Sequence, residues 1–282
     1  MQLSSVLRLP LCLALVATIA ACGGPPQATQ APPADPHYDA VLDGDTLIPA
    51  VSPGYLTDSN ARVEMDYTGG DAPGSIVVDP HARVLYLVQA GNRAVRYGIA
   101  VGREGRGFTG DASIRRKAEW PGWTPTANML RTDPEVYGPY AGGLPGGLEN
   151  PLGARALYLY RGGRDTYYRI HGTNNASTIG RATSAGCIRL FNQDAIDLFN
   201  QVETGAHVHV RSYEESVVAE GEMVEDERGL MVRVDSLAPE VQAQIRAGII
   251  PWPKFAPIIG VNATAPIMPA TITGETPPLP GT

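Results

Sequence analysis

The chain has 282 residues, of which 43% are hydrophobic and 18% charged, and its formal net charge at pH 7 is -7. This negative charge argues against binding of nucleic acid or of another anionic polymer by charge alone. The length leaves room for one good-sized domain with flanking segments, and 32 glycines and 25 prolines predict many loops and turns.

The first residues have the pattern of an export signal. Arg8 precedes an apolar stretch over residues 9–20, which is too short to span a bilayer of ordinary thickness. The stretch runs through small residues into Cys22 and resembles a bacterial lipoprotein signal, which implies a cleaved signal peptide over residues 1–21 and a lipidated Cys22. Gly23 after this cysteine resembles outer-membrane sorting, so we expect a periplasmic protein anchored in the inner leaflet of that membrane. The alternative is a plain secretory signal in which Cys22 is incidental.

Several segments flank the predicted domain. Residues 22–40 are rich in Pro, Gln, Ala and Gly, which predicts a flexible tether, and residues 41–73 lead into the domain. Residues 212–250 predict a small appendage of unreadable purpose, with a short helix expected over residues 238–247. Residues 251–282 are Pro-rich and predict a flexible tail.

Strand signals dominate the middle of the chain. Runs of β-branched and aromatic residues, separated by turn sequences, predict a meander, then a hairpin around Gly162-Gly163, then a closing strand. The predicted strands cover residues 75–78, 83–88, 94–101, 156–160, 166–170 and 206–210.

Helical periodicity is scarce in the same region. The best helical candidate is residues 194–202, and Asn192 is expected to cap its start. Residues 103–150 show no period and predict a long irregular lid or groove wall. The fold class expected is therefore mainly β with few short helices.

Cys187 has no partner for an intramolecular disulfide. Of the other two cysteines, Cys12 lies in the apolar leader and Cys22 just after it. An unpaired thiol in an exported protein is exposed to oxidation, and nucleophilic catalysis with a histidine base would give it a purpose. The alternative is an inert buried cysteine that acts as a small hydrophobe. Gly186 before it and Arg189 after it suit a reactive thiolate better.

The sequence around Cys187 resembles a known family. Ile170-His171-Gly172-Thr173-Asn174 and Ser184-Ala185-Gly186-Cys187-Ile188-Arg189 occur in the order seen in YkuD-type L,D-transpeptidases, bacterial enzymes of peptidoglycan remodelling. The likeness covers residues 74–211 and includes the upstream blocks 74–79, 85–88, 115–117 and 150–158. It implies a β-sandwich or barrel-like catalytic domain.

The resemblance implies a role for each matching residue. Cys187 matches the nucleophile, and His171 matches the base that accepts its proton. Gly172 matches the position whose carbonyl orients the imidazole, and Gly186 lies where backbone N–H groups would stabilise an oxyanion. Arg189 matches an arginine that orients a substrate carboxylate.

Further residues are candidates for substrate binding. They are Thr173, Asn174, Ser184, Trp120 and Trp123, and both tryptophans could instead pack beneath the lid. A basic group either meets stem-peptide carboxylates or forms a solvated face: Arg103, Arg106, Arg115, Arg116 and Lys117. Many family members carry a second histidine before Gly-Cys, whereas this chain has Ala185, so His171 inherits the base role.

The implied reaction transfers a peptidoglycan stem-peptide acyl group, taken from the L,D bond at diaminopimelate, through a cysteine thioester to an amine. The acceptor is a second stem peptide, giving a 3→3 cross-link, or an envelope protein. The expected partners are stem peptides and a membrane held through Cys22, with no nucleic acid, cofactor or metal.

Three alternatives stay open at this point. Water could resolve the thioester, which would make the protein an L,D-carboxypeptidase or amidase. The domain could also be a non-catalytic wall-binding lipoprotein. His207 and His209, with Cys187, could suggest zinc, but strong zinc sites bring more ligands at set spacing, and a solvated strand face is the other explanation.

Overall fold

The computed structural model describes residues 35–102, 108–184 and 186–248. The predicted signal peptide and Cys22, most of the tether, and the Pro-rich tail lie outside the described residues, as do Arg103, Arg106 and Ala185. None of the helices in the described ranges has both the length and the apolar character needed to cross a membrane.

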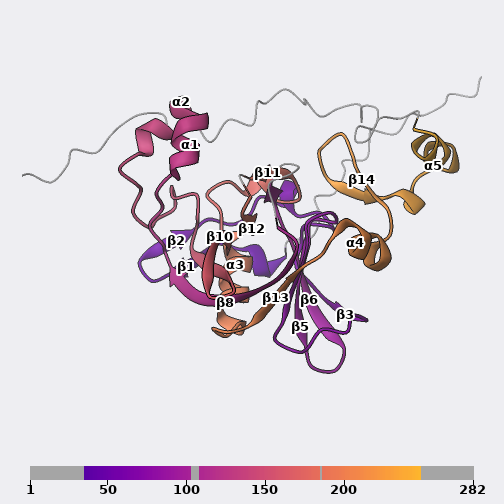
Figure 1. Ribbon diagram of the computed structural model, residues 1–282, viewed down its shortest axis with the longest axis horizontal. Coiled ribbons are helices and arrows are strands. Elements are labelled where there is room, and N and C mark those ends of the chain that lie inside the picture. The colour runs from indigo at the N-terminus through magenta and orange to yellow at the C-terminus, as the bar shows by residue number, and fades with distance from the viewer. Residues whose placement is uncertain (1–34, 103–107, 185, 249–282) are drawn as a thin grey trace, which may run out of the picture. The chain divides into compact units, whose positions relative to one another are not determined.

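One nine-stranded sheet forms the frame of the domain (Figure 1). Its strand order is β12-β10-β9-β8-β13-β4-β5-β6-β3, and only the β12–β10 and β13–β4 pairs are parallel. The strands are β3 (Val63–Asp66), β4 (Ile76–Asp79), β5 (Val84–Gln89), β6 (Arg93–Gly98), β8 (Gly110–Glu119), β9 (Arg155–Arg161), β10 (Arg164–His171), β12 (Ile188–Arg189) and β13 (His207–Val210).

The sheet curls back on itself. Ala100, just beyond β6, makes an antiparallel bridge to Arg189 in β12, although these strands stand far apart in the strand order. Close by, β7 (Val101–Gly102) pairs with β11 (Ala182–Ser184). The expected mainly β, barrel-like class with few short helices is therefore confirmed.

The main core lies between the sheet and α3 (Asn192–Gln201). Leu198 and Ala195 from this helix share one apolar cluster with Ile170, Leu157 and strand residues across the sheet. This burial fixes which faces of β9 and β10 point inward, because side chains alternate along a strand. The opposite face of the same strands is left for polar chemistry.

The prediction that residues 103–150 lack regular structure was wrong in part. Residues 110–119 form β8, which pairs with β9 on one side and β13 on the other. Its alternation was hard to read because the register shifts between Ile114 and Arg116. The segment beyond β8 contains α1 (Ala127–Thr132), α2 (Pro134–Tyr137) and η3 (Gly138–Tyr140) between irregular stretches.

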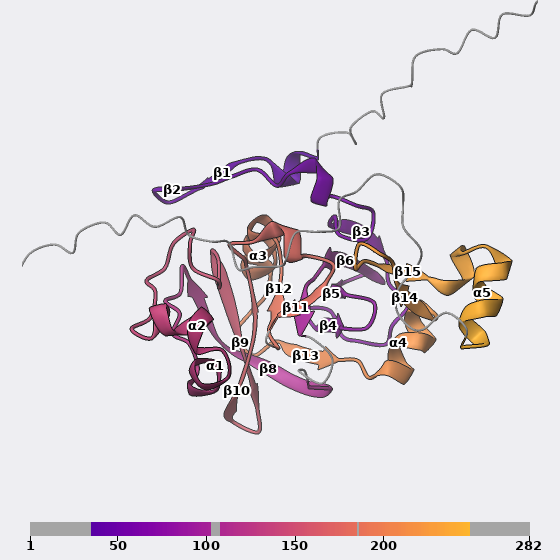
Figure 2. The same cartoon turned by 90° about the horizontal axis from the view of Figure 1, so that it is seen from above.

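The N-terminal lead-in packs along the start of α3 (Figure 2). Tyr38 is buried, makes an edge contact with Phe191 and donates a hydrogen bond to Asp194 at 3.1 Å. This lead-in comprises η1 (Pro36–Tyr38), the hairpin β1 (Val41–Asp43) and β2 (Thr46–Ile48), and η2 (Pro53–Tyr55).

The appendage after β13 is more regular than its sequence suggested. Its helix α5 (Pro239–Arg246) is the short helix expected over residues 238–247. The preceding α4 (Tyr213–Glu220) was not anticipated and begins with a capping box between Ser212 and Glu215. Between them lie β14 (Met223–Glu225), β15 (Met231–Arg233) and η5 (Val234–Ser236), while η4 (Ala176–Thr178) belongs to the domain before it.

Candidate active site

The register of four strands puts His171 and Arg189 side by side. Across β8, β9, β10 and β12, Ala118 lies opposite Ala156, Ala156 opposite His171, and His171 opposite Arg189. Residues directly opposite each other on neighbouring strands point to the same face of a sheet. A row of two small side chains, an imidazole and a guanidinium therefore crosses the face that points away from the core.

A second row runs parallel to the first, two residues earlier along β10. Arg116 lies opposite Tyr158, which lies opposite Arg169. The parallel register of β12 with β10 puts Cys187, immediately before β12, next to Arg169 at the end of this row. In agreement, Cys187 Sγ lies 3.9 Å from the carbonyl oxygen of Tyr167. The sheet thus presents the thiol and the imidazole on adjacent rows of one face.

His171 is held as a neutral base. Its side chain is buried, and Nδ1 lies 2.6 Å from the carbonyl oxygen of Gly172. A carbonyl only accepts, so Nδ1 carries the proton and Nε2 is left as the acceptor. Burial above all, with the positive charge of Arg189 second, lowers the pKa of His171 to about 3. The imidazole is therefore unprotonated at neutral pH, which is the working form of a general base.

Cys187 is a thiol at rest rather than a stable thiolate. Burial raises the pKa of Cys187, and this outweighs the backbone N–H and guanidinium of Arg169 and the charge of Arg189, which lower it. Such a thiol needs a base to remove its proton before it can attack a carbonyl. The neutral imidazole in the neighbouring row is of the right chemical type.

The turn before Cys187 is fastened by Ser184. The Ser184 hydroxyl donates to the carbonyl of Cys187 at 2.6 Å and accepts from Gly186 N at 3.1 Å. Gly186 has a φ of 137°, a region that favours glycine. Ser184, considered in the sequence as a substrate-binding residue, is buried and shapes the backbone around the thiol.

Asn192 holds the loop behind His171. Its Oδ1 accepts from Thr173 N at 3.1 Å and from Ala154 N at 3.0 Å, and its Nδ2 donates to the Thr173 carbonyl at 2.9 Å. A Cβ at Gly172 would collide with the same Oδ1. The expectation that Asn192 caps α3 was wrong: the helix begins at Asn192, with Phe191 in the capping position. The side chain is committed to contacts across the fold instead.

The remaining substrate-binding candidates occupy varied positions. Thr173 is buried in the same loop, whereas Asn174 is exposed and donates to the Glu149 carbonyl at 3.0 Å. Trp120 Nε1 donates to Asp43 in the N-terminal hairpin at 2.8 Å. Trp123 packs against tyrosines of the helical segment after β8. Among these contacts, neither tryptophan ring touches Cys187.

The described part of the basic group divides in two. Arg116 belongs to the second row, with its guanidinium 4.3 Å from the centre of the Tyr158 ring. Lys117 instead donates to the carbonyls of Phe199 and Val202, both at 2.6 Å, and so caps the end of α3. Arg115 is exposed and donates to Ser113.

The two histidines of β13 contact carboxylates on the strand face. His207 and His209 both contact Asp111 Oδ1, at 3.0 and 2.9 Å, and His209 also reaches Glu215 at 3.2 Å. Within the described ranges, no group of three or more His, Cys, Asp or Glu residues could hold a metal ion.

Sequence reasoning missed three members of the site. Arg169 and Tyr158 enter through strand pairing, and Asn192 through contacts with residues 19 and 38 positions away. A local motif records none of these long-range relations, although period-2 alignment of β9 and β10 could have found the first two.

Comparison with known proteins gives a consistent family. Residues 73–210 match the profile of the YkuD family, described as the L,D-transpeptidase catalytic domain. The probable L,D-transpeptidase YbiS of Escherichia coli K12 is 34% identical over 137 residues, which are 48% of this chain and 43% of that protein. The probable L,D-transpeptidase ErfK/SrfK of Salmonella typhimurium is 36% identical over 138 residues, again 48% and 43%. The chain thus spans less than half the length of these relatives.

A solved structure from Brucella melitensis, named a probable carnitine operon oxidoreductase, shares 47% identity over 53% of this chain and 92% of that one. Its TM-score is 0.39, so the likeness adds nothing about fold or function. The family match and the rows of side chains on one sheet face lead to one conclusion. Residues 73–210 of this chain belong to the YkuD family of L,D-transpeptidase catalytic domains.

Proposed function

We propose that this chain is an L,D-transpeptidase of the bacterial cell wall that works through a thioester on Cys187. One observation carries the proposal: within a domain of this family, a buried neutral His171 and the Cys187 thiol lie on adjacent rows of one sheet face. The neutral imidazole of His171 can accept a proton at once, and the Cys187 thiol must lose its proton before it can attack. Nucleophilic acyl transfer requires such a pair.

The first half-reaction forms the thioester. His171 Nε2 takes the thiol proton, and Cys187 Sγ attacks the carbonyl carbon of the L,D peptide bond at diaminopimelate. Backbone N–H groups around Gly186 and Cys187 stabilise the tetrahedral oxyanion. The C–N bond then breaks, and the imidazolium gives its proton to the departing amino group of the D-amino acid.

The second half-reaction regenerates the thiol. An acceptor amine attacks the thioester carbonyl and gives a proton to His171, the C–S bond breaks, and the imidazolium reprotonates the Cys187 sulfur. The product is an amide, either a 3→3 cross-link between stem peptides or a bond to an envelope protein. With water as the acceptor, the same steps would trim the stem, which is the hydrolytic alternative.

Arg189 is the group proposed to orient the substrate. Its side chain is half-buried beside His171, and its Nε has no hydrogen-bond partner among the residues that the structure describes. A buried unpaired guanidinium N–H is costly, and a substrate carboxylate would satisfy it.

The direct test uses the purified full chain with a stem tetrapeptide as donor and an amine acceptor, with products separated by mass spectrometry. We expect new amide product from the native chain and none from Cys187→Ala. Trimmed tripeptide without amide product would favour the hydrolytic alternative. Undiminished product from Cys187→Ala would overturn the thioester mechanism.

We also propose that the mature protein begins at a lipidated Cys22 and faces the peptidoglycan from the inner leaflet of the outer membrane. The support is the order of small residues before Cys22, the short apolar run and the Pro-rich tether. Mass spectrometry of the mature N-terminus tests this. We expect Cys22→Ser to abolish membrane fractionation while purified activity persists, and an unmodified native Cys22 would contradict the proposal.

A further inference from the structure

The strand that carries His171 is bent at Tyr167. The register of β10 against β9 shifts between Asp165 and Arg169, and Tyr167 has a φ of 63° with 76% of its side chain exposed. A left-handed backbone at an aromatic residue costs on the order of 1–3 kcal/mol and persists only where its surroundings enforce it. Strand bulges of this kind are enriched next to active sites.

The side chains of Asp165 and Arg169 close this bulge, and we call the pair the bulge clamp. Asp165 accepts from Arg169 Nη1 at 2.7 Å and Nη2 at 2.8 Å, which is a bidentate ion pair. Asp165 also accepts from Tyr167 N at 2.8 Å, and Arg169 Nη1 donates to the Tyr168 carbonyl at 2.9 Å. The Arg169 side chain is only 14% exposed, so solvent screens the pair less than an ordinary surface pair.

Tyr158 fixes the plane of the guanidinium. The Arg169 guanidinium carbon lies 4.3 Å from the centre of the Tyr158 ring, and the Arg116 guanidinium carbon lies 4.3 Å from the same centre. Planar stacking and a two-pronged carboxylate contact are properties of arginine that lysine does not reproduce. Only an arginine at position 169 therefore satisfies both partners.

The bulge clamp determines which backbone groups lie next to Cys187 Sγ. The Tyr167 carbonyl lies 3.9 Å from Cys187 Sγ, and the backbone N–H of Arg169 hydrogen-bonds the same sulfur. Both backbone groups belong to the bulge that the clamp closes. A change in the bulge would therefore move an acceptor for the thiol and a donor for the thiolate together.

We propose that the bulge clamp positions the nucleophile: Asp165 holds Arg169, and the resulting bulge aligns Cys187 Sγ and stabilises its thiolate. This inference rests on the proposed function and deepens it. Asp165 is a positioning residue, since it acts through Arg169 and the bulge rather than on the reacting atoms, whereas Arg169 also acts on the sulfur through its backbone N–H and its charge.

Because of the charges around the thiol, the proposal can be tested by whether the thiolate fraction of Cys187 rises or falls in a variant. Arg169 on β10 and Arg189 on β12 lower the pKa of Cys187 through their positive charges, and His171 lies on the adjacent row. Asp165 carries a negative charge in contact with Arg169, so its removal leaves the positive charge of Arg169 uncompensated and should favour the thiolate if charge alone matters. If the clamp positions the sulfur, Asp165→Asn should instead disfavour the thiolate.

The experiment follows alkylation of Cys187 by iodoacetamide in the full chain between pH 5 and pH 10. Tryptic digestion isolates Cys187 in the peptide of residues 182–189, which contains no other cysteine. For Asp165→Asn and Arg169→Lys we expect alkylation at pH 7 roughly five- to tenfold slower than for the native chain, with the pH midpoint moved upward by close to one unit. Arg164→Gln, at the exposed start of the same strand, is the matched control and should leave the profile unchanged.

Each outcome decides the matter. Faster alkylation of Asp165→Asn, or a native profile for Arg169→Lys, would overturn the proposal, because charge alone would then suffice. If Asp165→Asn fails to fold by circular dichroism, Arg169→Lys decides alone. In steady-state transfer we expect kcat to fall with KM within about threefold, as for lost alignment rather than lost binding.

The readout is independent of the reaction itself. Should the native chain prove to lack transferase activity, the alkylation profiles would still report whether the clamp controls the thiol. Failure of the proposed function and failure of this inference are therefore distinguishable.

Discussion

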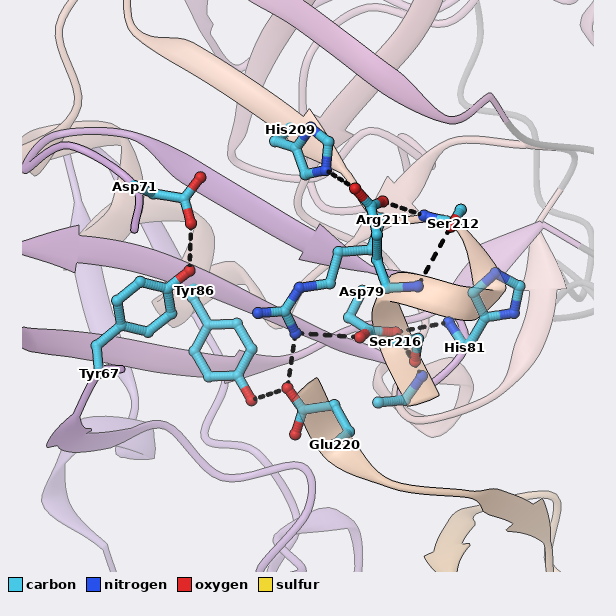
Figure 3. Close-up of polar contacts among 12 residues, drawn as sticks. Tyr67, Asp71, Asp79, His81, Tyr86, His209, Arg211, Ser212, Ser216 and Glu220 are labelled. Atoms are coloured by element: carbon cyan, nitrogen blue, oxygen red, sulfur yellow. Dashed lines mark hydrogen bonds and ion pairs between the residues drawn. The ribbon is translucent and has the colours of Figure 1, made fainter. Parts of the chain in front are cut away.

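Two polar clusters of the sheet differ in how fully their hydrogen-bonding groups are paired. At the end of β4, Asp79 accepts hydrogen bonds from His81 N at 3.0 Å, Ala82 N at 2.8 Å, Ser216 Oγ at 2.8 Å and Arg211 at 3.2 Å (Figure 3). The same Arg211 Nη1 donates to Glu220 at 2.7 Å, which also accepts from Tyr86 at 2.8 Å. We call this set the Asp79 cluster.

The face around Cys187 differs from the Asp79 cluster in one respect. Arg189 Nε, next to His171 in the first row, is buried and has no hydrogen-bond partner among the described residues. Buried polar groups are normally paired. The Asp79 cluster therefore joins α4 to the sheet through paired groups, whereas the Cys187 face keeps an unpaired donor, which the proposed function assigns to a substrate carboxylate.

The largest expected effect is at the face around Cys187. We expect His171→Ala to lower kcat for acyl transfer by 10²–10⁴-fold, as loss of a general base typically does, while the melting temperature stays within a few degrees. Because Ala185 precedes Gly186, the motif offers no substitute imidazole. Steady-state kinetics on folded protein provide the measurement, and near-native kcat would shift attention to His207 and His209.

The opposite pattern is expected at the Asp79 cluster. Arg211→Met leaves the buried Asp79 carboxylate without its cation, so the free energy of unfolding should fall by roughly 3–5 kcal/mol in urea titration. The matched change Arg93→Met breaks an exposed pair with Asp66 and should cost about 0–1 kcal/mol. Neither change should alter kcat per folded molecule, and a lower kcat for Arg211→Met would blur the distinction between the clusters.

Asn192 shares features with both clusters. Its hydrogen bonds are made within the protein, and they hold the loop that follows His171. Asn192→Ala leaves two backbone N–H groups unpaired, so we expect a loss of roughly 1–3 kcal/mol in unfolding free energy and a lower kcat. Thermal denaturation and kinetics on the same preparation test this. A loss of stability with native kcat would mean that the loop keeps its geometry without Asn192.

A pH dependence of stability is expected outside both clusters. Burial, before any partner, raises the pKa of Asp194 to about 8, so the folded state binds this proton more tightly than the unfolded state. The stability that this proton provides is full below the ordinary pKa near 4 and is lost as the pH rises through about 8. Relative to the native chain, Asp194→Asn should therefore gain roughly 1 kcal/mol or more in unfolding free energy between pH 5 and pH 8. A difference that stays constant over that range would show that Asp194 is ionised throughout.

Local sequence signals account for much of the fold and for the centre of the site. Alternation and turn residues located the meander of β4, β5 and β6, and the order of motif blocks singled out His171 and Cys187. The strand β8 escaped because a register shift breaks its alternation. By contrast, α4 carried a readable signal in its capping box that was overlooked.

What could not be read from the sequence depends on strand pairing. The Arg116–Tyr158–Arg169 row exists only because three strands meet in one register, and the role of Asn192 depends on backbone far along the chain. Local propensity would place an asparagine at the start of a helix as a cap, but two unpaired N–H groups in the fold compete for the same side chain. Tertiary demand outweighed the local preference there.

A covalent acyl intermediate on Cys187 is the central element of the proposed mechanism. Mixing the full chain with a stem tetrapeptide in the absence of acceptor, followed by acid quenching and mass spectrometry of residues 182–189, would detect it. We expect an acyl group on Cys187 that appears with release of the terminal D-amino acid, disappears when an amine acceptor is added, and is absent from Cys187→Ala. Turnover of the tetrapeptide with no acyl group on this peptide at any time, and with the Cys187→Ala chain equally active, would contradict the account.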